Sequence, residues 1–230
     1  MREIVLDTET TGFEPGEGDR IVEIGAVELF NHMPTGKVYH QYINPERSMP
    51  QGAFEVHGLG DEFLRDKPVF KKVGQAFLDF VGDATLVIHN AAFDMKFLNA
   101  ELGWGGFALL PNNQALDTLT IARKKFPGSP ASLDALCRRF GIDNSAREKH
   151  GALLDSEILA EVYLELIGGR QPDLVLSASS GSTSQGAASD AWRPMPRPEP
   201  LAPRITEEER AAHQVFVDKL GDAALWKSQT

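Results

Sequence analysis

The sequence predicts an α/β domain over residues 1–170, followed by a linker and a short helical tail. Short apolar runs typical of strands lie mainly in the first part of this region. Segments with the apolar period of helices follow them, interrupted by one more strand. The composition then changes to mostly Ser, Ala, Gly and Pro. We therefore expect three parts, at residues 1–170, 171–204 and 205–230.

Four segments have the apolar content of strands. They are residues 4–6, 20–30, 37–43 and 85–88. The second stays apolar on both sides of Glu23, and the alternation in the third predicts a hairpin between these two strands. Residues 12–19 are rich in glycine and acids and predict a loop, and residues 54–58 predict a turn that carries His57.

Five segments show the apolar spacing of helices. They are residues 69–81, 93–102, 116–126, 132–140 and 152–167. The last is the clearest, because apolar residues recur every four positions from Leu154 to Leu166 and Gly168 and Gly169 end it. Cys137 lies in the fourth of these helices, where we expect it to pack in the core.

The composition is that of a soluble globular protein. Of 230 residues, 42% are hydrophobic and 24% are charged, and no apolar run is long enough to span a bilayer. No basic, apolar leader opens the chain. The single cysteine excludes an intramolecular disulfide. We expect a cytoplasmic protein without a membrane partner.

The net charge is −10, from 33 acids and 23 bases. Such a chain should bind a polyanion poorly by itself. This argues against an autonomous nucleic-acid binder of high affinity. It does not exclude an enzyme that meets phosphate through metal ions, or one tethered to a partner that holds the substrate.

The tail predicts a docking segment. Residues 177–204 contain five prolines between positions 194 and 203, and we expect a flexible linker. Thr206 and Glu209 have the spacing of a helix capping box. The apolar residues that follow are Val215, Phe216, Leu220, Leu225 and Trp226. A short amphipathic helix beyond a linker favours a groove on another protein, and the alternative is a tail that folds back on its own domain.

The first strand ends in two acids. Asp7 and Glu9 project from the same face of the strand, about 7 Å apart along it. They are either half of a divalent-metal site or a strand end that runs into solvent. Asp94 and Asp155 lie near the starts of two predicted helices, where an acid can also act by stabilising the helix terminus. His150 alone would suit an exposed loop.

The order of these residues is more informative than any one of them. Asp-x-Glu at 7–9, Asn-x-x-x-Asp at 90–94 and His-x-x-x-x-Asp at 150–155 occur in sequence. Together they resemble the three exonuclease motifs of the DEDDh family, the DnaQ-like 3′–5′ exonucleases. The resemblance covers residues 1–170. It implies a ribonuclease H-like fold, in which a mixed central sheet is flanked by helices.

The resemblance also implies roles for these residues. Asp7, Glu9, Asp94 and Asp155 would bind two divalent ions, Mg²⁺ or Mn²⁺, with Asp7 bridging them, and His150 would be the general base. Two such ions about 3.5–4 Å apart activate a water and stabilise the departing 3′ oxygen. Imidazole suits the role of base, because its unperturbed pKa of about 6.5 leaves the neutral form available at pH 7.

Further residues resemble family positions that bind the substrate: Thr8, Thr11, His57, Asn90 and Phe93. Phe93 is alternatively a core aromatic. His57 and His89 either line the pocket or only satisfy hydrogen bonds in the interior. The basic runs at 123–125 and 138–139 are more typical of solvated helix faces than of phosphate sites.

A short peptide follows the domain directly. Residues 171–176, Gln-Pro-Asp-Leu-Val-Leu, are similar to the Gln-x-x-Leu-x-(Phe/Leu) peptides that bind the bacterial sliding clamp. This similarity assigns Gln171, Leu174 and Leu176 to clamp binding. The alternative is a chance hexapeptide.

The linker and tail are similar to the polymerase-binding end of the proofreading subunits of bacterial DNA polymerase III. This similarity implies that Phe216, Leu225 and Trp226 bind the alpha subunit of that polymerase. The implied activity is removal of mispaired 3′-terminal nucleotides from DNA whose 3′ end is single-stranded or frayed. Two alternatives stay open: an RNA-trimming 3′–5′ exonuclease of the same family, or a non-catalytic scaffold that links polymerase and clamp.

Overall fold

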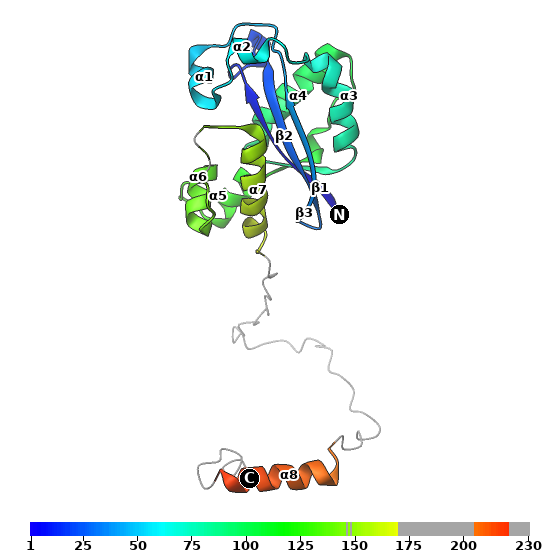
Figure 1. Ribbon diagram of the computed structural model, residues 1–230, viewed down its shortest axis with the longest axis vertical. Coiled ribbons are helices and arrows are strands. Elements are labelled where there is room, and N and C mark those ends of the chain that lie inside the picture. The colour runs from blue at the N-terminus through cyan, green and yellow to red at the C-terminus, as the bar shows by residue number, and fades with distance from the viewer. Residues whose placement is uncertain (146, 148, 170–204, 221–230) are drawn as a thin grey trace, which may run out of the picture. The chain divides into compact units, whose positions relative to one another are not determined.

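The computed structural model describes residues 1–145, 147, 149–169 and 205–220 (Figure 1). The chain divides into two compact units, Met1–Leu176 and Ser177–Thr230. The first unit is a mixed sheet flanked by helices, so the expected fold class is confirmed. Among the described helices, none has both the length and the apolar character that a membrane crossing needs.

Five strands form one sheet, in the order β3-β2-β1-β4-β5. Their bounds are Arg2–Thr10 (β1), Ile21–Phe30 (β2), Met33–Tyr42 (β3), Thr85–Ile88 (β4) and Ala115–Asp117 (β5). The first three pair antiparallel, whereas β4 is parallel to both β1 and β5. The carboxyl ends of β1 and β4 therefore meet at one edge of the sheet, where residues distant in sequence come together.

Helices cover both faces of the sheet (Figure 1). The helices of this unit are α1 (Gln51–His57), α2 (Asp61–Leu64), α3 (Phe70–Val81), α4 (Ala91–Gly105), α5 (Thr118–Lys125), α6 (Leu133–Phe140) and α7 (Ala152–Leu166), with short 3₁₀ turns at Pro15–Glu17 (η1) and Asn112–Gln114 (η2). Ile4 and Leu6 pack into a core with α3 and α4, and Val5 packs into a second core with α5, α6 and α7. The alternation along β1 therefore directs Asp7 and Glu9 toward the α7 face and Thr8 toward the α4 face.

Two sequence expectations are wrong. The segment predicted as one helix over 116–126 begins with β5, and α5 starts only at Thr118, because the Asp117 side chain accepts the Leu119 N–H and caps the helix. The turn predicted over 54–58 is the end of α1, a helix that sequence periodicity did not indicate. Gly58 ends this helix at φ 77°, in the left-handed region that glycine adopts most easily.

The other predicted elements are present with shifted bounds. Helix α4 is longer than expected at both ends, and β3 begins at Met33 instead of Lys37. Cys137 is fully buried in the second core, as expected.

The start of α7 lies directly against β2. A β-carbon added to Gly25 would lie 2.1 Å from the carbonyl carbon of Ala152 and from the Leu153 nitrogen. Ser156 Oγ donates to the Gly25 carbonyl at 2.9 Å, and Glu23 Oε2 accepts from the Ala152 N–H at 3.2 Å. This close approach places the first turn of α7 beside the end of β1.

In the second unit, α8 (Glu207–Lys219) has the predicted capping box. Glu209 N–H donates to Thr206 Oγ1 at 3.2 Å, and Thr206 N–H donates to Glu209 Oε2 at 2.8 Å. Phe216 of this helix is 58% exposed. The predicted linker at 177–204 and the anchors Leu225 and Trp226 lie outside the described residues.

We predict that Gly25→Ala destabilises the first unit, because the added methyl group meets backbone atoms that cannot rotate away. The expected loss is about 3 kcal/mol, the upper end of the usual overpacking cost. This corresponds to a fall in Tm of roughly 6–12 °C by calorimetry. Gly103→Ala is the matched control, since its methyl group would meet only Leu109 Cδ2 at 3.7 Å in ordinary contact. Equal Tm values for the two variants would contradict the role given to Gly25.

Candidate active site

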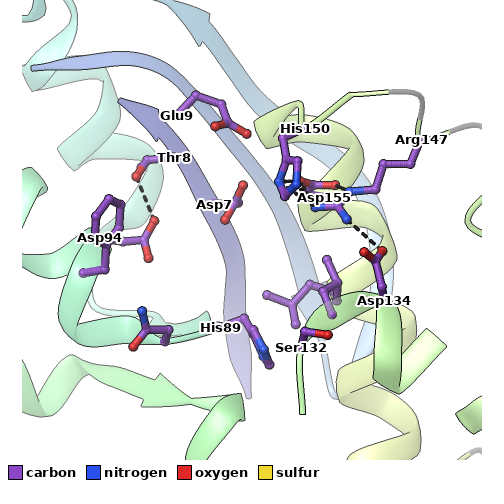
Figure 2. Close-up of a pocket in the computed structure, with 14 residues that line it drawn as sticks. Asp7, Thr8, Glu9, His89, Asp94, Ser132, Asp134, Arg147, His150 and Asp155 are labelled. Atoms are coloured by element: carbon purple, nitrogen blue, oxygen red, sulfur yellow. Dashed lines mark hydrogen bonds and ion pairs between the residues drawn. The ribbon is translucent and has the colours of Figure 1, made fainter. Parts of the chain in front are cut away.

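A cavity of about 260 Å³ lies at the carboxyl ends of β1 and β4, beside the start of α7. The four predicted acids and His150 all line it, together with Thr8, Asn90 and Phe93. Figure 2 shows the carboxylates of Asp7, Glu9, Asp94 and Asp155 around this one space. His89 lines it too, and so do five residues that sequence reasoning did not select: Ser132, Leu133, Asp134, Arg147 and Leu159.

Asp94 reaches the cavity from the first turn of α4. Asn90, just before this helix, has φ 69°, and Asp117 Oδ1 accepts the N–H of Asn90 at 3.0 Å and of Ala91 at 3.4 Å. These contacts fix where α4 begins. Thr8 Oγ1 then donates to Asp94 Oδ1 at 2.7 Å in a buried hydrogen bond. Thr8 lies on the face of β1 opposite to Asp7 and Glu9, and from there it orients Asp94.

Asp155 reaches the cavity from the first turn of α7 and is 3% exposed. Arg147 Nε donates to its Oδ1 at 2.5 Å, and Arg147 Nη2 donates to its Oδ2 at 2.8 Å. Nη2 also lies 2.8 Å from His150 Nδ1. Because a guanidinium only donates hydrogen bonds, Nδ1 must accept this one and be unprotonated. His150 Nδ1 lies farther from Asp155 Oδ2, at 3.5 Å.

Three of the four acids are hard to ionise in this cavity. Burial raises the pKa of Asp7 well above its ordinary value, and the charges of Asp94 and Glu9 raise it further. Burial, followed by repulsion from Asp155, raises the pKa of Glu9 to about 8. Burial also raises the pKa of Asp94 to about 7, although the hydrogen bond from Thr8 opposes this. The cavity therefore favours either protons or a cation.

Asp155 differs from the other acids. Burial alone would raise its pKa, but the neighbouring His150 side chain and the hydrogen bonds from Arg147 outweigh burial and lower it. The Arg147 charge also lowers the pKa of Asp7 and Glu9. One guanidinium thus offsets part of the negative charge of the whole cluster.

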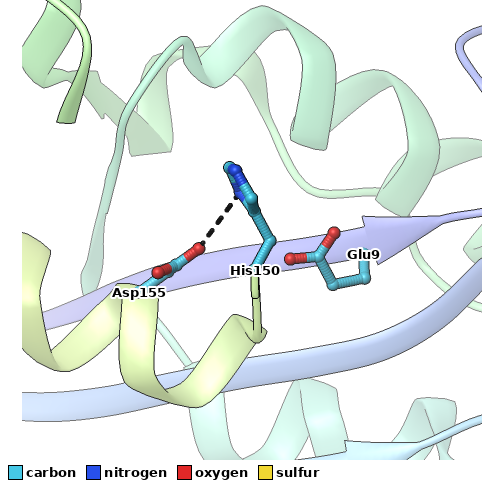
Figure 3. A group of neighbouring side chains, drawn as sticks. All are labelled: Glu9, His150 and Asp155. Atoms are coloured by element: carbon cyan, nitrogen blue, oxygen red, sulfur yellow. Dashed lines mark ion pairs between the residues drawn. The ribbon is translucent and has the colours of Figure 1, made fainter. Parts of the chain in front are cut away.

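The donor set suits a hard divalent cation. Ligand atoms of Glu9, His150 and Asp155 lie within 4.8 Å of one another (Figure 3). Mg²⁺ and Mn²⁺ prefer carboxylate oxygens, and a cation between these groups would relieve the repulsion that raises their pKa values. The residues present therefore fit a divalent-metal site.

A second cavity, of about 590 Å³, adjoins the first and shares Thr8, Glu9 and Phe93 with it. The predicted substrate residues Thr11 and His57 line this second cavity. The Thr11 hydroxyl is already used within the fold, since it donates to Asp19 Oδ1 at 3.1 Å and accepts the Arg20 N–H at 3.0 Å.

One of the two ring nitrogens of His57 makes a hydrogen bond and the other does not. Its Nδ1 accepts the Leu59 N–H at 3.0 Å, whereas Nε2 is buried without a hydrogen-bond partner. Phe93 packs against Phe97 in the core and against Phe13, which is 81% exposed beside the cavity. Sequence reasoning did not select Phe13 as a residue of this cavity. The one signal in the sequence was its position directly after Gly12.

The structure describes one of the predicted partner-binding residues, Phe216. Phe216 belongs to the second unit. Gln171, Leu174, Leu176, Leu225 and Trp226 lie outside the described residues, so their assignments stay predictions. Arg147 could not be selected from the sequence, because Lys149 is also positively charged and lies closer to His150 in the chain.

Comparisons with known proteins agree with this geometry. A family model described as Exonuclease (RNase_T) matches residues 4–163. The DNA polymerase III subunit epsilon of Rickettsia felis is 48% identical over 223 residues, covering 96% of this chain and 97% of the relative. The subunit of the same name from Escherichia coli is 44% identical over 243 residues, covering 99% and 98%.

Solved structures support the fold. The nuclease domain of 3′hExo, a DEDDh family member bound to rAMP, superposes with a TM-score of 0.63 at 20% identity. The match covers 72% of this chain and 91% of that domain. At this identity the comparison bears on architecture alone.

We predict that the metal-free chain loses stability as the pH rises from 6.5 to 8. Folding raises the pKa of Glu9 from 4.5 to about 8, so the folded state holds this proton more tightly than the unfolded state does. The free energy of unfolding therefore falls as the pH rises above 4.5, and it keeps falling until the pH reaches about 8. Over this window the loss is about 2 kcal/mol, or roughly 4–8 °C in Tm, measured in EDTA. Asp94 adds to the lower part of the window, since its pKa is about 7.

Histidines do not account for this slope. Burial lowers the pKa of His57 and His89 below 6.5, so these two groups make the protein more stable as the pH rises toward 6.5. Their contribution changes little above pH 6.5. Glu9→Gln imitates the protonated acid and should make the profile less steep above pH 6.5, while Asp7 and Asp94 keep part of the slope. A parent chain whose Tm is constant from pH 6.5 to 8 in EDTA would contradict the raised pKa of Glu9.

Proposed function

The chain belongs to the Exonuclease (RNase_T) family, whose model matches residues 4–163, and from that premise we propose that the acidic cavity is its hydrolytic centre. The enzyme is a nuclease that hydrolyses phosphodiester bonds as a 3′–5′ exonuclease. Its relatives at 44–48% identity are named DNA polymerase III subunit epsilon and match almost the whole chain. We therefore assign it the removal of mispaired 3′-terminal nucleotides during DNA replication in the cytoplasm. The convergence of four carboxylates on one cavity at the end of β1 is the observation that supports this most.

Divalent ions are the cofactors of this family, and we propose that two Mg²⁺ or Mn²⁺ ions bind here. When bound, they supply Lewis acidity and offset the charge of the phosphodiester. Asp7, Glu9 and Asp155 would hold one ion, and Asp7 with Asp94 the other. Thr8 keeps Asp94 oriented through its 2.7 Å hydrogen bond, and Glu23 anchors the start of the helix that carries Asp155.

His150 is the proposed general base. Its side chain is 50% exposed at the edge of the cavity, so it can exchange a proton with solvent after each turnover. Its Nδ1 accepts a hydrogen bond from Arg147, so this ring nitrogen carries no proton. A neutral ring with an unprotonated Nδ1 carries its proton on Nε2, so it can take a proton from water only at Nδ1, after Arg147 has released that nitrogen.

The second cavity is the proposed place for the terminal nucleotide. It adjoins the acids through Thr8 and Glu9, and it offers Phe13 and Phe93 as apolar surfaces for a base. His57 and Thr11 line the same space, and Asn90 lines the first cavity. Contacts of this kind accept any base, because each base has a face that can stack. Selection of mispaired ends then follows from fraying, since a mispaired end unpairs at lower cost.

We also propose that the chain works as part of a larger assembly. With a net charge of −10, it should hold DNA weakly by itself. Helix α8 presents exposed Val215 and Phe216, and exposed Leu220 directly follows it, which suits a groove on a polymerase subunit. The peptide at 171–176 is the proposed contact with a sliding clamp. A tether of this kind raises the effective concentration of the enzyme at the 3′ end without high intrinsic affinity.

We predict that His150→Ala lowers kcat about 10²–10⁴-fold, the usual effect of losing a general base. Asp7→Ala should abolish hydrolysis and serves as the inactive reference. The assay uses DNA and RNA oligonucleotides of one sequence with paired or mispaired 3′ ends. Parent protein should degrade mispaired DNA fastest. A His150→Ala enzyme whose pH–rate profile equals that of the parent would exclude His150 as the base, and faster cleavage of RNA would favour an RNA-trimming enzyme.

A second prediction concerns the tail. Full-length protein should bind the polymerase subunit, and a chain that ends at Gly169 should not, as measured by surface plasmon resonance. Phe216→Ala should weaken binding about tenfold or more, because exposed aromatic anchors dominate such interfaces. Gln214→Ala is the control, since Gln214 lies on the other side of α8, bonded to Asp218 at 3.1 Å. Equal binding by the full-length and shortened chains would exclude the tail as the docking segment.

A further inference from the structure

A guanidinium lies among the acids proposed to bind metal. The Arg147 side chain is 8% exposed, and its contacts with Asp155 use both carboxylate oxygens, at 2.5 and 2.8 Å (Figure 2). Such paired hydrogen bonds between arginine and a carboxylate are strong and fix the orientation of both groups. Among the described residues that line this cavity, Arg147 is the one lysine or arginine.

Arg147 is also held from the outside. Its Nη1 donates to Asp134 Oδ1 at 2.8 Å, and the same oxygen accepts from Asn144 Nδ2 at 3.0 Å. Asp134 lies on α6 and its side chain is 46% exposed, so it faces the rim of the cavity. Arg147 would therefore keep one ionic partner if its contact with Asp155 were broken.

We propose that Arg147 is the counter-cation of the metal-free site, a positioning residue that holds Asp155 and His150 and competes with the divalent ions for Asp155. This inference rests on the proposed function, because it takes Asp155 as a metal ligand. Arg147 touches two of the groups that carry out the reaction and acts through them.

The electrostatics of the cavity require such a group. Glu9, Asp94 and Asp155 are buried and Asp7 is half-buried beside them, so the four carboxylates repel one another. A buried carboxylate without a partner is costly. Guanidinium stays charged at every pH at which the protein folds. It satisfies both oxygens of Asp155 when no metal does. A divalent ion that binds Asp155 must displace this contact or share the carboxylate with it.

Competition for one carboxylate has a reciprocal consequence. If the guanidinium weakens metal binding, then metal binding weakens the contact between Arg147 and Asp155 by the same factor. Removal of the guanidinium should therefore tighten metal binding and, at the same time, destabilise the metal-free protein. A residue that only supported the fold would produce the second effect without the first.

The test is a calorimetric titration of the full-length, metal-free chain with Mn²⁺, without nucleic acid. Arg147→Ala should bind Mn²⁺ about tenfold more tightly than the parent, within the usual range of coupling between two sites. Arg147→Lys keeps the charge and should stay close to the parent. Arg138→Ala removes one exposed positive charge from α6 and should also match the parent. Affinity of Arg147→Ala that is equal to or weaker than that of the parent would overturn the proposal.

Melting curves provide a second readout. In EDTA, Arg147→Ala should melt below the parent, and saturating Mn²⁺ should remove most of the difference. A variant that folds only when Mn²⁺ is present gives the same answer. A variant that stays equally far below the parent in Mn²⁺ has lost packing alone, and the proposal fails.

Asp7→Ala separates this proposal from the function on which it rests. If the parent and Asp7→Ala bind Mn²⁺ equally, the acids do not form the metal site and the proposed hydrolytic centre is wrong. If Asp7→Ala loses Mn²⁺ binding while Arg147→Ala equals the parent, the metal site stands and only the role of Arg147 is wrong.

Discussion

Mutual repulsion among four carboxylates at the end of β1 is the constraint on which the rest of this structure depends. Each acid alone would ionise easily in water, but together and largely out of water they cannot all do so. Burial and repulsion raise the pKa of Asp7, Glu9 and Asp94, whereas Asp155 stays ionised beside a guanidinium. The cluster is therefore incomplete without cations, and the surrounding fold must hold it together against its own charge.

The fold holds these acids through polar contacts between neighbouring elements. Thr8 donates to Asp94 on the α4 face of β1, Glu23 accepts from the first N–H of α7, and Asp117 accepts from the N–H groups where α4 begins. Each contact fixes the start of a helix or a side chain in its first turn. The N–H groups at a helix start also favour an anion, which offsets part of the cost of placing Asp94 and Asp155 there.

Much of this could be predicted from the sequence, because it depends on local periodicity. Alternation along β1 placed Asp7 and Glu9 on one face, and the capping box of α8 followed from Thr206 and Glu209. Strand β5 could not be predicted, because three residues show no period and only pairing with β4 makes them a strand. The contact of Gly25 with α7 and the position of Arg147 depend on residues that meet only after folding.

The same charges connect metal binding with substrate binding. A cavity lined by carboxylates repels a phosphodiester, so DNA and the proposed divalent ions must each raise the affinity of the other. Arg147 can stabilise the cluster between turnovers, but one guanidinium cannot neutralise four acids. The net charge of −10 also opposes tight binding of DNA by the chain alone. The proposed tether through the tail would supply proximity without affinity. Weak intrinsic binding would then leave a paired 3′ end in the duplex while a frayed end enters the site.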